Sequence, residues 1–202
     1  MTRRLHSRVG LTLTLALAVS ALPALAWGPR AEVAIVGTAA HVISQDGAVR
    51  LSNLEKDIKV GASISHEMAL KLCPNIDTDP LGAIETQMYL LKSVRGNRID
   101  PYYAYRLGVL GKLVASSTAP LAEANPTYRN LYYADVENNI QEAVLTPSHR
   151  VLVDSAAYFQ RLQREARTQE DVILKDYQSG QGFAGAARAS LSADASRSVS
   201  AV

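Results

Sequence analysis

Apolar residues recur every three to four positions along most of this chain, and no stretch alternates apolar and polar residues with a period of two. That spacing is typical of amphipathic helices, and proline, glycine, aspartate and asparagine interrupt it where helices are expected to end. The pattern predicts an all-α fold of six to seven helices around one core. The expected helices cover residues 31–44, 52–63, 66–72, 81–94, 102–117, 128–144 and 148–178.

The first 26 residues follow a different pattern. Three arginines (Arg3, Arg4 and Arg8) precede an apolar run over residues 9–22, and a small-x-small sequence closes the segment at Ala26. This order is that of a secretory signal peptide, so we expect residues 1–26 to be removed and the protein to be exported, to a periplasm or the cell exterior. The mature chain would begin at Trp27.

Size and composition divide the remainder into two parts. Residues 27–178 are long enough for one helical domain with a single core. Residues 179–202 consist mainly of alanine and serine, and we expect this tail to be disordered.

Charge and cysteine content exclude some classes of function. The whole chain has 21 basic and 19 acidic residues, but the first 26 residues hold three of the basic ones and no acid, which leaves 18 against 19. A net charge of −1 carries no nucleic-acid signature. Cys73 is the only cysteine, so an internal disulfide is impossible, and we expect Cys73 to behave as a small buried residue.

The helix expected before Pro120 has the spacing of a metal-binding segment. Lys112 and Ser116 lie about 40° apart on one helical face, and Ala122 follows six residues later. Histidine and aspartate at these positions would bind a metal ion, whereas lysine, serine and alanine are poor ligands at neutral pH. The segment therefore has the spacing of a zinc site without its chemistry.

Several features together resemble the zinc-dependent phospholipases C and the related zinc-dependent single-strand nucleases, which are exported all-helical proteins. Trp27 stands directly after the expected cleavage site, where this family begins its mature chain with a tryptophan that binds zinc. Gly61-Ala62 opens a segment similar to the family's Gly-Ala-x-x-Pro-Asp motif, with His66 in place of the aspartate. Gly108 and Pro120 match the family's Gly-x-x-x-His-x-x-x-Asp-x-x-x-Pro-x-His segment.

The same resemblance places non-ligands at most of the zinc positions. Glu32 stands for an early family histidine, and in the family's His-x-x-x-Glu pair the acid is kept while the histidine is lost. The positions equivalent to family ligands are Trp27, Glu32, His66, Lys112, Ser116, Ala122, Tyr133 and Glu137. Zinc-assisted phosphoester hydrolysis needs several ligands to hold its ions and activate a water molecule, and too few remain here.

We therefore expect a catalytically inactive relative of this family, with no catalytic residue, metal or other cofactor, that acts as a binding or interaction module. Its partner is unknown from the sequence; a phospholipid or another protein would fit. The alternative is a diverged metal-dependent phosphoester hydrolase, of phospholipase C or nuclease type, that uses zinc. A third interpretation is an unrelated helical protein.

The role of Lys112 stays open between three interpretations. It could form a salt bridge with Glu32 or Glu137, bind an anion, or lie on a solvated face. The apolar residues Leu107, Leu110 and Val114 on the opposite arc of the helix favour the solvated face.

Overall fold

Helices are the only regular elements in the part of the chain that the structure describes, so the all-α prediction is confirmed. The computed structural model describes residues 27–45, 51, 53–94, 99–148 and 153–202. The α-helices are α1 (Pro29–Gln45), α2 (Glu55–Ala62), α3 (His66–Leu72), α4 (Pro80–Val94), α5 (Pro101–Ser117), α6 (Pro126–Asn139), α7 (Ser155–Gln178) and α8 (Ala186–Ala201). Two short 3₁₀ helices, η1 (Ile140–Glu142) and η2 (Gly182–Ala184), adjoin α6 and α8.

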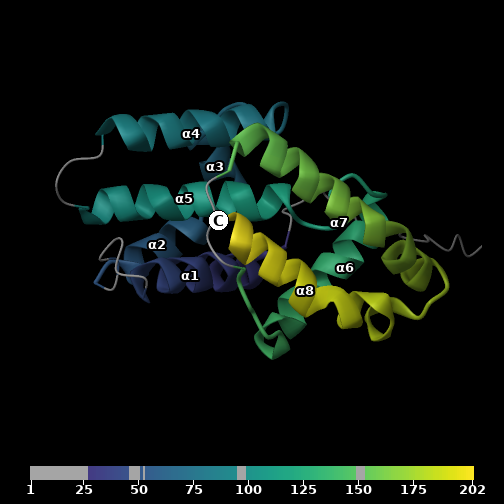
Figure 1. Cartoon of the computed structure of the whole chain (residues 1–202). Helices are drawn as coiled ribbons and strands as arrows, with labels where there is room; N and C mark the ends of the chain where they lie inside the picture. Colours follow the sequence, from purple (N-terminus) through teal and green to yellow (C-terminus); the bar gives the residue numbers. More distant parts are fainter. Residues whose placement is uncertain (1–26, 46–50, 52, 95–98, 149–152) are drawn as a thin grey trace, which may run out of the picture.

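Helix α5 lies at the centre of this arrangement. It runs between α4 on one side and the α1–α2 pair on the other, and the C-terminal end of α8 lies next to it (Figure 1). Asp100 caps the helix by accepting the Tyr103 N–H at 2.7 Å, and Pro101 occupies the first turn, where its missing N–H costs nothing. The segment that carries Lys112 and Ser116 is therefore surrounded by other helices.

Two glycines allow α2 and α5 to cross in direct backbone contact. A Cβ atom built on Gly61 would lie 2.0 Å from the carbonyl oxygen of Tyr105. A Cβ atom built on Gly108 would lie 2.0 Å from the carbonyl oxygen of Ile58. No side chain fits at such distances, so each helix depends on a glycine facing the backbone of the other.

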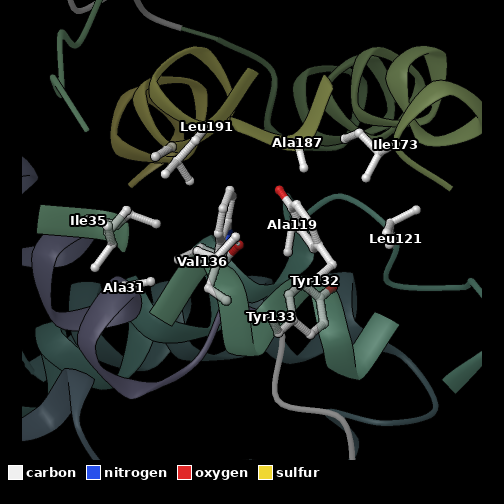
Figure 2. Close-up of a cluster of buried hydrophobic side chains, with 14 of the residues drawn as sticks. Ala31, Ile35, Ala119, Leu121, Tyr132, Tyr133, Val136, Ile173, Ala187 and Leu191 are labelled. Atoms are coloured by element: carbon white, nitrogen blue, oxygen red, sulfur yellow. Dashed lines mark hydrogen bonds between the residues drawn. The ribbon is translucent and has the colours of Figure 1, made fainter. Parts of the chain in front are cut away.

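The C-terminal segment differs from the expectation of disorder. Residues 186–201 form α8, which contacts α1, α5 and α7. Its buried residues Ala187, Leu191, Ala195 and Val199 recur every four positions and form one apolar stripe. Figure 2 shows Leu191 and Ala187 on the side of α8 that faces Val136 and Tyr132 of α6.

Small side chains explain both why residues 179–202 were expected to be disordered and how α8 packs. Alanine and serine resemble a low-complexity tail in composition, but on a helix they allow close approach to neighbouring helices. Thr118, at the end of α5, and Ser198 of α8 share a buried hydrogen bond of 2.8 Å. With α8 included, the described residues contain eight α-helices rather than six to seven.

The last expected helix also begins later than predicted. Residues 143–148 are not helical, and α7 starts at Ser155 after Asp154, whose carboxylate accepts the Ala157 N–H at 2.9 Å. The expected 128–144 helix likewise ends early, with α6 ending at Asn139 before η1.

The predicted signal peptide, residues 1–26, lies outside the described residues. None of the helices in the described ranges is long and apolar enough to cross a membrane.

Three serines of α8 hold residues 144–148 along the helix. The N–H groups of Val144, Thr146 and Ser148 donate to the hydroxyls of Ser192, Ser196 and Ser200 at 3.1, 2.9 and 2.9 Å. Two residues of extended chain advance about 6.6 Å and one four-residue step along a helix about 6.0 Å, so the two spacings nearly match. Alternate backbone donors therefore meet successive serines.

Substitution Gly108→Ala should destabilise the protein. Alanine is intrinsically better in a helix than glycine by about 1 kcal/mol, but its methyl group would collide with the Ile58 carbonyl. Overpacking of this kind costs about 1–3 kcal/mol or more, so we expect a net loss of about 2 kcal/mol in urea unfolding followed by circular dichroism. Thr86→Ala, on the exposed face of α4, is the control and should change stability little. Unchanged or increased stability of Gly108→Ala would contradict the close crossing.

Replacing Ser192, Ser196 and Ser200 together by alanine should release residues 144–148. Each lost hydrogen bond is worth about 1 kcal/mol, and the freed N–H groups lie at the surface, where water can replace the hydroxyls. We expect faster hydrogen exchange at Val144, Thr146 and Ser148, with protection in α5 unchanged. Equal exchange rates in the two proteins would refute the proposed role of the serines.

Candidate functional site

A carboxylate and an ammonium group are paired inside the protein, between α1 and α5. Glu32 is 0% exposed and Lys112 is 2% exposed. The Lys112 Nζ donates a hydrogen bond to Glu32 Oε2, and the Ser116 hydroxyl donates to Glu32 Oε1 at 3.2 Å. Lys112 and Ser116 thus lie on the same face of α5, one turn apart, as their spacing predicts.

Local sequence explains why Glu32 points inward. It lies on the same stripe of α1 as Ile35, Val36 and Ala39, all of which are buried. Burial raises the pKa of the Glu32 carboxyl to about 7, because a charge is unfavourable away from water. Lys112 and the hydrogen bond from Ser116 oppose this effect, and the nearby Glu137 carboxylate adds to it.

Trp27 and Tyr133 are buried next to the Lys112–Glu32 pair. The Trp27 side chain is fully buried, and its indole N–H donates to the Ala115 carbonyl at 3.0 Å, next to Ser116 in the sequence. Trp27 has a φ of 63°, in the left-handed region. The Tyr133 hydroxyl donates to the Pro120 carbonyl at 2.7 Å, and burial raises the pKa of this phenol.

Glu137 caps the N-terminus of α1 from the neighbouring helix α6. Its carboxylate accepts the Arg30 N–H at 2.9 Å and the Ala31 N–H at 3.3 Å. These N–H groups have no partner within α1, and the positive end of the helix dipole favours a carboxylate there. The carboxylate of Glu137 thus has a structural role.

Six of the eight ligand-equivalent residues gather where the start of α1 meets α5 and α6: Trp27, Glu32, Lys112, Ser116, Tyr133 and Glu137. The other two make different contacts. His66 pairs with Asp77 at 3.1 Å, and Ala122 is exposed, with its carbonyl accepting a hydrogen bond from Arg129 at 3.0 Å.

Among the three interpretations of Lys112, the structure selects the ion pair with Glu32. The solvated face is wrong because Gly108, Gly111 and Ala115 belong to the buried surface of α5 together with Lys112. The large apolar residues of α5 do not mark this face as interior, because its other members are glycine and alanine. The sequence signal for the ion pair is Glu32, a carboxylate that falls within the apolar stripe of α1.

Sequence reasoning missed Glu170. Its carboxylate, on α7, accepts the N–H of Leu121 at 2.8 Å, and Leu121 has a φ of 60°. Glu170 thereby fixes the turn after α5 that places Pro120 against Tyr133. No local pattern marks this role, because the two residues lie 49 positions apart.

The residues gathered around Glu32 do not fit a zinc ion. A lysine ammonium occupies one carboxylate oxygen, and a serine hydroxyl occupies the other. Across the described ranges, no three histidine, cysteine, aspartate or glutamate side chains form a group that could hold a metal ion. The near-complete burial of both charges also closes this spot to a substrate.

Comparison with known proteins adds no relative. Neither a protein-family model, nor a curated protein, nor a solved structure matches the chain. The resemblance to the zinc-dependent phospholipases therefore rests on the residues of this chain alone.

Substitution Lys112→Met should destabilise the protein increasingly as the pH rises. Without its ammonium partner, the Glu32 pKa should rise above the present value of about 7, while the unfolded chain keeps the ordinary value of 4.5. A raised folded-state pKa stabilises at low pH, and this stability is lost as the pH rises through that pKa. We expect a loss of about 3 kcal/mol near pH 8 and much less near pH 5, measured by urea unfolding.

The double variant Glu32→Leu/Lys112→Met is the control, because it removes both buried charges together. Such replacements are often neutral or stabilising, so the double variant should recover most of the lost stability at about pH 8. A Lys112→Met loss that is independent of pH, or no recovery in the double variant, would argue against a coupled buried pair.

Proposed function

We propose that this protein is an exported, catalytically inactive relative of the zinc-dependent phospholipases C that acts as a binding module. The observation that carries the proposal is the buried Lys112–Glu32 pair. Two positions equivalent to family zinc ligands hold a carboxylate and a cation that neutralise each other. Trp27 and Glu137, equivalent to two further ligands, adjoin the same pair.

Lysine can replace the charge of a metal ion but not its chemistry. Its ammonium supplies a fixed positive charge that balances Glu32. It has no open coordination position, and it cannot lower the pKa of a bound water molecule as zinc does. The internal cation therefore neutralises Glu32 where a metal would have catalysed phosphoester hydrolysis.

Export is part of the proposal because of the sequence before Trp27. The arginine-rich start, the apolar run and the small-x-small sequence at Ala26 support cleavage before this residue. Trp27, the first residue of the mature chain on this reading, is fully buried. Cleavage there would leave a mature chain whose first side chain is anchored in the core.

Elemental mass spectrometry of protein exported to the periplasm of a bacterial host, with N-terminal sequencing, tests the proposal. We expect a chain that begins at Trp27, carries no stoichiometric zinc, and hydrolyses neither bis-p-nitrophenyl phosphate nor phosphatidylcholine. Its thermal stability should not change on chelation, because Lys112 already balances Glu32. Two or three zinc ions per chain, with hydrolysis lost on chelation, would overturn the inactive assignment.

A matched variant tests the resemblance itself. Glu32→His, Lys112→His and Ser116→Asp together supply the residue types that the family has at three neighbouring positions. If this variant folds, it should bind zinc and gain thermal stability when zinc is added, because histidine and aspartate are good ligands. A folded variant that binds no zinc would count against the shared scaffold, and the metal content of the unsubstituted protein decides the matter if the variant does not fold.

A further inference from the structure

A groove lies on the protein surface between α1 and α2, with a volume of about 710 Å³. Its lining includes Arg30, Val33, Gly37, Lys59, Ser63 and Ile140. A second hollow shares Val33, Lys59 and Ser63 with it and adds Lys56 and Val60. The two hollows together form one continuous surface, which we call the α1–α2 groove.

The apolar part of the lining, which we call the floor of the α1–α2 groove, includes Val33 and Ala34 of α1 and Ile140 of η1. Gly37 leaves room for the stem of Lys59, whose Cε would lie only 3.1 Å from a Cβ atom at position 37. The Lys59 stem therefore lies across α1.

The rim of the groove has an excess of positive charge. Arg30, Lys56 and Lys59 stand against one carboxylate, Glu55, whose oxygen lies 3.6 Å from the His41 ring. The Arg30 side chain is 67% exposed and makes only a loose pair with Glu137 at 3.8 Å. The described residues give neither Lys56 nor Lys59 a carboxylate partner within salt-bridge distance.

We propose that the α1–α2 groove binds an extended acidic segment of a partner protein. Apolar side chains of this segment would lie on Val33 and Ile140, and its carboxylates would meet Lys56, Lys59 and Arg30. Complementary charges of this kind steer association and fix the register of the bound segment.

The shape of the groove favours a peptide over other anionic partners. An open groove would leave much of a small molecule exposed, whereas small-molecule sites usually bury most of their ligand. A lipid bilayer presents a broad surface that cannot enter a concave groove. An extended chain places alternate side chains against the floor and toward the rim.

A docking role for this groove rests on the binding function proposed above, but the two can fail separately. Metal content and hydrolysis decide the proposed function without reference to the groove. Peptide binding decides the role of the groove, whether or not the protein holds zinc.

Fluorescence anisotropy with a defined peptide tests the docking role. The probe is a short fluorescein-labelled peptide in which glutamate alternates with valine, added to the purified protein at low salt. Its affinity should fall at least about tenfold in Lys56→Glu/Lys59→Glu, and added salt should weaken binding to the unsubstituted protein. The matched control is Lys71→Glu/Lys92→Glu, which changes the net charge equally on α3 and α4 and should bind almost normally.

Either of two results would overturn the proposal: an absence of peptide binding, or equal binding by the two charge-matched double variants. If the peptide does not bind, binding to vesicles that contain phosphatidylglycerol, lost only in the Lys56→Glu/Lys59→Glu variant, would assign the groove to a membrane surface instead. Circular dichroism should show that all variants remain folded, as expected for exposed lysines.

Discussion

The burial of the Glu32 carboxylate is the constraint on which the rest of the structure depends. An ionised carboxylate away from water costs several kcal/mol unless a cation and hydrogen-bond donors meet it. Lys112 and Ser116 supply these donors from α5, so any packing of α1 on α5 that keeps Glu32 buried has to keep these residues together. Glu137 binds the N–H groups one and two residues before Glu32, which extends the same constraint to α6.

Other contacts hold α5 in place around this pair. The glycine crossing brings α2 against one side of α5, and α8 contacts both α1 and α5. Small side chains make both contacts possible, since neither a leucine at Gly108 nor bulky residues along α8 would leave the backbones so close. The dense packing lowers the local dielectric, which strengthens the attraction between Lys112 and Glu32 and raises the cost of separating them.

The sequence predicted those parts of the fold that depend on local pattern. Helices α1, α3, α4 and α5 follow the apolar period and the proline and aspartate signals at their ends, and the structure places them within a few residues of the expectation. The sequence did not predict α8, because half of its four-residue apolar stripe is alanine, whose burial depends on what packs against it. Nor did it place Lys112, because a lysine becomes an interior residue only through a carboxylate 80 positions away.

Three residues that support the family resemblance also have a structural reason in this protein. Gly108 permits the helix crossing, Trp27 anchors the start of α1 to α5, and Glu137 caps α1. The resemblance is therefore supported by the location of these residues around one buried pair, and not by the identity of any one of them.

Helix α1 joins this buried pair to the surface of the protein. The backbone of Arg30 is held by Glu137 beside the Lys112–Glu32 pair, while its exposed side chain lines the α1–α2 groove. Glu32 and Val33 are consecutive residues, one facing the interior and the other the floor of the groove. An ion pair that holds α1 in place thereby also holds Arg30 and Val33 of the groove, and a preorganised surface loses less entropy when it binds a partner. In this way the buried Lys112–Glu32 pair would support the proposed binding function.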